Sequence, residues 1–203
     1  MPKQTNSQID FVLPWVDGAD SAWQERYNKY SENKGDRDVS RFRDWDLLRY
    51  WFRSIEKFSP WFRKVFFITS GELPDWLDIN HPQLKWIKHE DYIPAEYLPT
   101  FSANTIEMNL HRIEGLSEQF VYFNDDFFIT NHIPQTRFFY KNLPCDYAVM
   151  TAKPVGGGII HMAINDLEVI DKHFDKHTAI KKHFGKWFSL KYGSRLVSNM
   201  LLY

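Results

Sequence analysis

The sequence predicts an α/β protein with a mostly parallel sheet flanked by helices. An apolar run at 9–16 is followed by a helical pattern at 44–58 and then by a second apolar run at 65–69. This strand, helix, strand order is typical of a parallel βαβ unit. A further helical pattern at 102–116 precedes another short apolar run, 120–123, which extends the same alternation.

The first elements expected are a buried strand and a short polar helix. Residues 9–16 form the strand, which Pro14 interrupts and which the turn Asp17-Gly18 ends. Asp20 or the serine after it can cap the helix that follows. The polar, charged stretch 33–40 then predicts a loop.

A longer helix is expected between Asp44, as its N-cap, and Pro60, which ends it. Apolar side chains recur at helical spacing within it, which predicts one buried face. The strand 65–69 comes next, then a short helix led by Pro74 and a third strand at 84–87.

A further helix should begin at Ser102 or Asn104. Its apolar side chains fall on one face, namely Ile106, Leu110, Ile113 and Leu116. The strand 120–123 follows, and the chain after it predicts a strand at 147–151 and a helix at 164–174.

With 43% apolar residues, 203 residues can bury one sizeable core, so we expect one domain over residues 1–203. Its apolar, uncapped end predicts a C-terminally incomplete domain.

Composition excludes several partners. Lys and Arg number 25 against 26 Asp and Glu, and no basic run occurs, which argues against nucleic acid as a partner. The single cysteine, Cys145, cannot form an internal disulfide and fits a reducing compartment, so we expect a cytoplasmic protein. No apolar stretch approaches the roughly 20 residues needed to span a bilayer, so any membrane contact should be peripheral, at the inner face.

The most informative motif is Asn124-Asp125-Asp126, which lies between two aromatic-rich apolar runs. Two adjacent carboxylates suit a hard divalent cation that bridges to phosphate oxygens. We expect a tight turn or strand end with at least one side chain facing a cleft, because open parallel sheets bind ligands at their carboxyl ends. The alternative is an acidic turn between two hairpin strands.

Two other groups have both a functional and a plain interpretation. Arg41 and Arg43 precede a helix, where guanidiniums can hold a diphosphate, although a solvated charged loop also fits. Glu107 and His111 are four residues apart on an expected helix, able to act as acid, base or metal ligand. A surface Glu-His pair is the alternative.

Five segments in order resemble the Stealth proteins, which are sugar-1-phosphate transferases of bacterial capsules and cell-surface polysaccharides. They are DFVLPWVDGAD (10–20), RFRDWDLLRYWFRSIEKFSPW (41–61), KVFFITSGELPDW (64–76), LPTFSANTIEMNLHRIEGLSE (98–118) and FVYFNDDF (120–127). The family is related to the catalytic subunit of the lysosomal-enzyme GlcNAc-1-phosphotransferase. The resemblance implies a Rossmann-like, GT-A-type sheet, a UDP-sugar donor and Mg²⁺ or Mn²⁺.

The resemblance also implies roles for particular residues. Asp125 and Asp126 would hold the metal, and Asp126 would belong to the catalytic group. Either Glu107 or His111 would act as the base or orient the acceptor. The expected donor contacts are Trp15 and Asp17 at the uridine or ribose, and Arg41, Arg43 and Arg112 at the phosphates.

The expected reaction transfers hexose-1-phosphate, with N-acetylglucosamine-1-phosphate favoured, from a UDP-sugar to a hydroxyl of a polysaccharide or lipid-linked glycan, and it releases UMP. An ordinary glycosyltransferase that attacks the sugar carbon and releases UDP is the first alternative. A non-catalytic carbohydrate-binding module is the second. Family members carry later regions with a His and an Arg beyond the motifs found here, so we expect weak or no transfer by these 203 residues alone.

Overall fold

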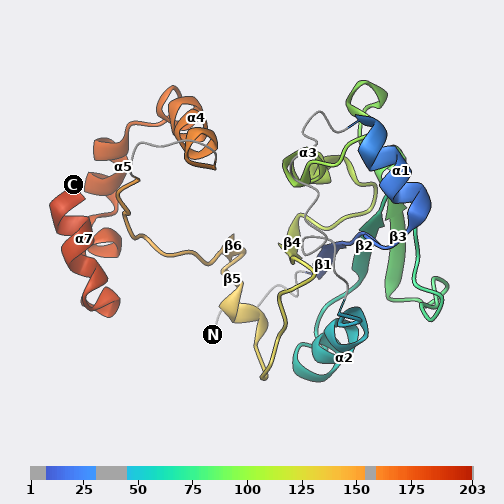
Figure 1. Cartoon of the computed structure of the whole chain (residues 1–203). Coiled ribbons are helices and arrows are strands. Elements are labelled where there is room, and N and C mark those ends of the chain that lie inside the picture. The colour runs from blue at the N-terminus through green and yellow to red at the C-terminus, as the bar shows by residue number, and fades with distance from the viewer. Residues whose placement is uncertain (1–7, 31–44, 154–158, 203) are drawn as a thin grey trace. The chain divides into compact units, whose positions relative to one another are not determined.

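The structure is a computed structural model that describes residues 8–30, 45–153 and 159–202 (Figure 1). By its internal contacts the chain divides into two compact units, Met1–Cys145 and Asp146–Tyr203. That the whole chain folds as one domain stays a prediction.

The first unit contains a sheet of four parallel strands. Their order across the sheet is β3-β2-β1-β4, with bounds β1 Ile9–Pro14, β2 Val65–Thr69, β3 Leu84–Lys88 and β4 Gln119–Tyr122. The chain therefore moves outward from β1 to β3 and then crosses to the other side of β1. Such a reversal opens a crevice at the carboxyl ends of the two diverging strands, here β1 and β4. This sheet confirms the predicted α/β, Rossmann-like architecture.

The helices of this unit are mostly short. The α-helices are α1 Ser21–Tyr30, α2 Leu48–Phe58 and α3 Ala103–Met108. The 3-10 turns are η2 His89–Asp91, η3 Ala95–Tyr97, η4 Leu110–Arg112 and η5 Gln135–Arg137. Strands β5 Phe139–Tyr140 and β6 Leu143–Pro144 form a small antiparallel hairpin. The second helix begins after Leu47, and its expected cap, Asp44, lies outside the described residues. Pro74 heads a turn closed by a 3.0 Å hydrogen bond from Leu77 N–H, so the short helix expected there is wrong.

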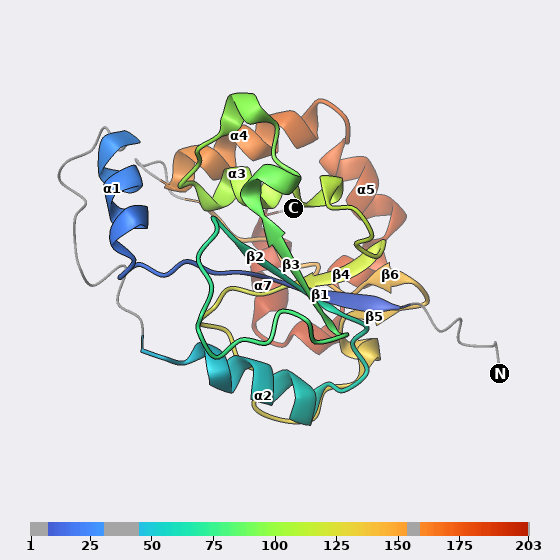
Figure 2. The same cartoon turned by 90° about the vertical axis from the view of Figure 1, so that its right-hand side faces the viewer.

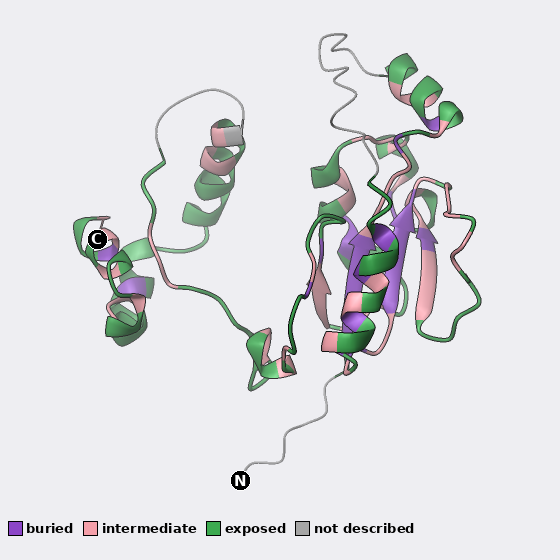
Figure 3. Ribbon diagram, turned by 60° about the horizontal axis from the view of Figure 1, so that its bottom comes forward, coloured by how far each residue is buried: buried purple, intermediate pink, exposed green. Residues whose placement is uncertain are grey.

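The two faces of the sheet are covered by different elements (Figure 2). Alternate residues of the strands point to opposite faces, so Phe11 packs with Trp51 of α2 and Val12 packs on the other side with Leu110. The strands β1 and β2 are almost entirely buried (Figure 3). Because both faces are covered, these strands read as continuous apolar runs in the sequence.

The helix expected over residues 102–116 ends early, at Met108. The side-chain amide of Asn109 donates to Thr105 O at 2.9 Å, while its backbone N–H bonds to Glu107 O. A side-chain donor thus replaces the backbone donor of the next helical turn, which stops the helix. The 3-10 turn η4 follows and carries the buried Leu110 into the core.

The second unit is helical, with α4 Ile159–Asp171, α5 Lys176–Lys182, α6 Phe184–Trp187, η6 Leu190–Tyr192 and α7 Arg195–Leu202. The strand expected at 147–151 is wrong. Asn199, fully buried on α7, accepts from Met150 N at 2.6 Å and donates to Ala148 O at 2.7 Å, so a side chain satisfies the backbone groups that a neighbouring strand would pair. Among the described helices of both units, none has the length and apolarity to cross a membrane.

Candidate active site

A cavity of about 240 Å³ lies at the carboxyl edge of the sheet, and its wall includes Pro14 of β1 and Tyr122 of β4. Residues just beyond the strand ends line it: Trp15 after β1, Ser70 after β2, His89 after β3, and Asn124 and Asp125 after β4. Segments outside the sheet complete the wall with Trp23, Thr100, Phe101, Ala103 and Ile106. We call this the first cavity.

The acidic motif forms a tight turn at the mouth of the β1/β4 crevice. Phe127 N–H bonds to Asn124 O at 3.1 Å, with the two aspartates between them. A 2.9 Å bond from Phe123 N–H to Val12 O continues the ladder of β4 and β1, so the turn lies beside the end of β1. Both aspartates are exposed, but Asp125 lines the first cavity and Asp126 does not. Residues 127–130 form no strand that could pair with β4, so the alternative of a hairpin turn is wrong.

The donor set at this turn fits one kind of metal site. Within the described ranges, no three His, Cys, Asp or Glu side chains converge closely enough to cage an ion. Mg²⁺ usually takes one or two carboxylates, keeps several waters and completes its shell with substrate phosphate oxygens. Asp125 on the cavity wall suits that arrangement, in which the metal arrives together with a phosphate ligand.

Glu107 is linked to the cavity wall by a tyrosine. The hydroxyl of Tyr122, a lining residue, donates to Glu107 Oε1 at 3.0 Å. Burial, this bond and the charges of Glu107 and Asp125 raise the pKa of Tyr122. The phenol therefore stays protonated and keeps one oxygen of the Glu107 carboxylate occupied.

The other residue of the expected acid-base pair lies elsewhere. Because α3 ends at Met108, His111 belongs to η4 and does not share a helix with Glu107. Its Nδ1 lies 2.9 Å from Met108 O, and its side chain is exposed outside the cavity wall. Arg112 is likewise exposed and does not line the cavity. The structure thus joins Glu107 to the first cavity only through its bond with the lining residue Tyr122, and neither His111 nor Arg112 lies on the cavity wall.

The residues expected at the donor are divided. Trp15 lines the first cavity and stacks on Phe67 with ring centroids 5.9 Å apart. The carboxylate of Asp17 accepts Ala19 N–H at 2.9 Å within a turn, so it shapes the loop and does not line the cavity. Arg41 and Arg43 lie outside the described residues.

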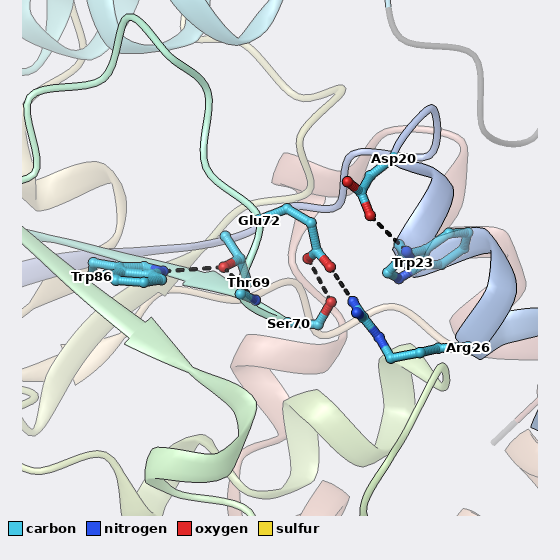
Figure 4. Close-up of polar contacts among 8 residues, drawn as sticks. Asp20, Trp23, Arg26, Thr69, Ser70, Glu72 and Trp86 are labelled. Carbon is cyan, nitrogen blue, oxygen red and sulfur yellow. Dashed lines mark hydrogen bonds and ion pairs between the residues drawn. The ribbon is translucent and has the colours of Figure 1, made fainter.

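A buried carboxylate organises the neighbouring wall (Figure 4). Glu72, whose side chain is 9% exposed, accepts from Ser70 Oγ at 2.6 Å and pairs with Arg26 of α1. Asp20 caps that helix by accepting Trp23 N–H at 2.6 Å, which confirms the predicted cap. The ion pair therefore ties a capped helix to the end of β2.

A second cavity, of about 290 Å³, adjoins the first and shares four of its residues. The shared residues are Ser70, His89, Thr100 and Phe101, and the others are Arg26, Lys88, Glu90, Leu98 and Pro99. Burial lowers the pKa of His89, although the charge of Glu72 opposes that change, so the imidazole is neutral at neutral pH. Sequence reasoning missed His89, yet one signal was present: it lies two residues beyond the strand expected at 84–87.

Comparison with known proteins matches most of the chain. The family model for Stealth protein conserved region 1 matches residues 7–35, and the model for conserved region 2 matches 41–145. A capsular polysaccharide phosphotransferase of Streptococcus pneumoniae is 42% identical over 96% of this chain and 60% of its own length. A capsular polysaccharide phosphotransferase of Streptococcus thermophilus is 41% identical over 95% of this chain and 83% of its own length. An exopolysaccharide phosphotransferase of Lactiplantibacillus plantarum is 38% identical over 91% of this chain and 55% of its own length. The chain thus spans about 60% of the length of the pneumococcal relative.

Proposed function

The chain belongs to the Stealth family, and we propose that it transfers a sugar phosphate from an activated donor to a hydroxyl of a capsular or cell-surface polysaccharide. The names of the relatives support the reaction class. The observation that carries the proposal here is the position of Asp125 on a cavity at the β1/β4 crevice, where open α/β sheets bind phosphorylated ligands.

The donor we propose is a UDP-sugar, with N-acetylglucosamine-1-phosphate as the transferred group. In this reaction the acceptor hydroxyl attacks the β-phosphorus, the bond from that phosphorus to the bridging oxygen breaks, and UMP leaves. Phosphoryl transfer of this kind depends on positioning and on neutralising charge, so it needs no covalent intermediate with the protein. A cavity built from four strand ends offers rigid positioning.

The described residues take distinct parts in this proposal. Asp125 would hold Mg²⁺ or Mn²⁺, which neutralises charge on the diphosphate when bound. Tyr122 and Glu107 form a rigid hydrogen-bonded pair beside it. Trp15 offers a ring at the cavity wall for the nucleoside. Asp126 and Arg112 would contact the part of the donor that extends beyond the first cavity. The roles of Arg41 and Arg43 stay predictions.

Analysis of the reaction products tests the proposal. The full chain is incubated with UDP-N-acetylglucosamine, Mg²⁺ and a capsular oligosaccharide, and the products are identified by mass spectrometry. We expect slow release of UMP, in keeping with the weak transfer predicted for these 203 residues alone, and an oligosaccharide that gains a sugar phosphate. Release of UDP with addition of an unphosphorylated sugar would make the protein an ordinary glycosyltransferase. Titration of the UDP-sugar with and without Mg²⁺ separates both from a carbohydrate-binding module, which would bind glycan but no donor.

A further inference from the structure

The second cavity has a charge balance that differs from that of a phosphate site. Its two cations already have carboxylate partners: Arg26 pairs with Glu72, and Lys88 Nζ lies 3.5 Å from Glu90 Oε1. With His89 neutral, the wall carries little net charge, so it offers a diphosphate no excess of positive charge. Charged groups that are paired in this way still present hydrogen-bond donors and acceptors to an uncharged ligand.

The remaining wall is apolar and held in place. Leu98, Pro99 and Phe101 supply it. Phe101 packs edge-on against Trp23 and Tyr27 of α1, with ring centroids 5.7 and 5.3 Å apart. An apolar surface beside convergent polar groups suits a sugar ring, which has an apolar face and a rim of hydroxyls.

His89 lies where the two cavities meet, since it lines both. Its ring is half-buried, and within the part of the chain that the structure describes no side chain hydrogen-bonds to it. The ionisable groups around it come from every neighbouring wall: Glu72 and Arg26, Lys88 and Glu90, and Asp125 and Tyr122. A neutral imidazole in that position can accept a proton from a hydroxyl that reaches from the second cavity into the first.

We propose that the second cavity binds the acceptor sugar and that His89 receives the proton of its attacking hydroxyl. This inference rests on the proposed function. The acceptor oxygen forms a bond to the β-phosphorus, the bond from phosphorus to the bridging oxygen breaks, UMP leaves with that electron pair, and the hydroxyl proton moves to His89. The donor occupies the first cavity, so the two substrates meet at the wall that the cavities share.

Sugar binding without turnover tests the subsite. Saturation-transfer NMR is recorded on the full chain with the methyl glycosides of glucose, galactose and N-acetylglucosamine. We expect at least one to bind, and the double variant Lys88→Ala/Glu90→Ala to weaken its binding about tenfold, which corresponds to loss of about 1.4 kcal/mol of contacts. Affinity for the UDP-sugar should change less than about twofold.

The matched control is Glu56→Ala/Lys57→Ala on α2, which also removes one exposed charge of each sign. Lys57, like Lys88, lies over an aromatic ring, here Phe58 at 5.0 Å. This variant should bind glycoside and donor as the unaltered chain does. Absence of binding by all three glycosides, or equal binding by both double variants, would overturn the subsite.

The role of His89 is tested by kcat and its pH dependence. In His89→Gln, kcat should fall about 10²- to 10⁴-fold and lose its rise with pH, while donor affinity is retained. Thermal unfolding followed by circular dichroism checks that the variant folds. Unchanged kcat would overturn the role of His89. If the unaltered chain transfers no sugar phosphate, the proposed function and the proton step both fail, whereas glycoside binding still decides whether the second cavity is a sugar subsite.

Discussion

The guanidinium of Arg63 holds both carboxylate oxygens of Asp10, with Nε 2.7 Å from Oδ1 and Nη2 on Oδ2. Asp10 is fully buried on β1. Arg63 Nη2 also donates to Gly115 O at 2.7 Å, and Ser117 N–H donates to Asp10 Oδ2 at 2.8 Å. The bond to Asp10 raises the pKa of Arg63. One ion pair thus joins three segments near the amino ends of β1, β2 and β4, at the edge of the sheet opposite the cavities.

Removal of Arg63 should destabilise this unit strongly. Arg63→Ala leaves a buried carboxylate whose remaining hydrogen-bond partner among the described residues is the backbone N–H of Ser117, and breaking a buried pair in this way costs about 3 to 5 kcal/mol. Urea unfolding measures the change. The control is Lys88→Ala, which breaks an exposed pair and should cost less than about 1 kcal/mol. Equal stability of the two variants would contradict the structural role of the Asp10–Arg63 pair.

His89 should make stability depend on pH in a defined direction. Burial lowers its folded-state pKa below the ordinary value of 6.5, so between those two values the unfolded chain binds more protons than the folded chain. The contribution of His89 to the free energy of unfolding is therefore complete above about pH 6.5, and it is lost as the pH falls toward the folded-state pKa. In urea unfolding at pH 5 and 7.5 without ligands, His89→Gln should lose less stability on acidification than the unaltered chain. Identical losses would show that the imidazole is not desolvated.

The strands were predictable because burial on both faces leaves a local signature. Residues 65–69 form β2 with the predicted bounds, since each of them is buried. The acidic turn at Asp125 was predictable for a related reason: polar residues that directly follow such a run lie at the edge of the sheet, where ligands bind.

Features that depend on one side chain bonding to the backbone left no such signature. Asn109 ends α3 early, and Asn199 takes the hydrogen bonds that a strand at 147–151 would have made. The second cavity was missed for the same reason. Arg26 and Lys88 meet on its wall although they come from α1 and β3, and no spacing rule relates residues on separate elements.

Tyr122 should resist ionisation in the folded protein. Its pKa is raised by burial and by the bond to Glu107, so in a titration followed at 295 nm the variant Tyr122→Phe should match the unaltered chain up to about pH 11. The control is the same titration of each chain unfolded in urea, where every tyrosine ionises near pH 10. There the signal of the variant should be smaller by one of the 10 tyrosines. A smaller signal from the folded variant below that pH would mean that Tyr122 is already ionising and cannot hold Glu107.

The two adjacent aspartates should contribute unequally to donor binding. Both are exposed, but Asp125 lines the first cavity and its charge acts on Tyr122, whereas Asp126 is outside the lining of that cavity. Each change to Asn removes one negative charge from the same turn, so the pair of variants is matched in charge and location.

Asp125→Asn should lower the rate of sugar-phosphate transfer about 10²- to 10³-fold, the usual effect of losing one group that stabilises charge in the transition state. It should also abolish the dependence of UDP-sugar affinity on Mg²⁺ in calorimetric titration, because the carboxylate that anchors the metal is gone. Asp126→Asn should retain that dependence. An Asp126→Asn variant that loses Mg²⁺-dependent binding while Asp125→Asn keeps it would place the metal outside the first cavity and would remove the observation on which the proposed function rests.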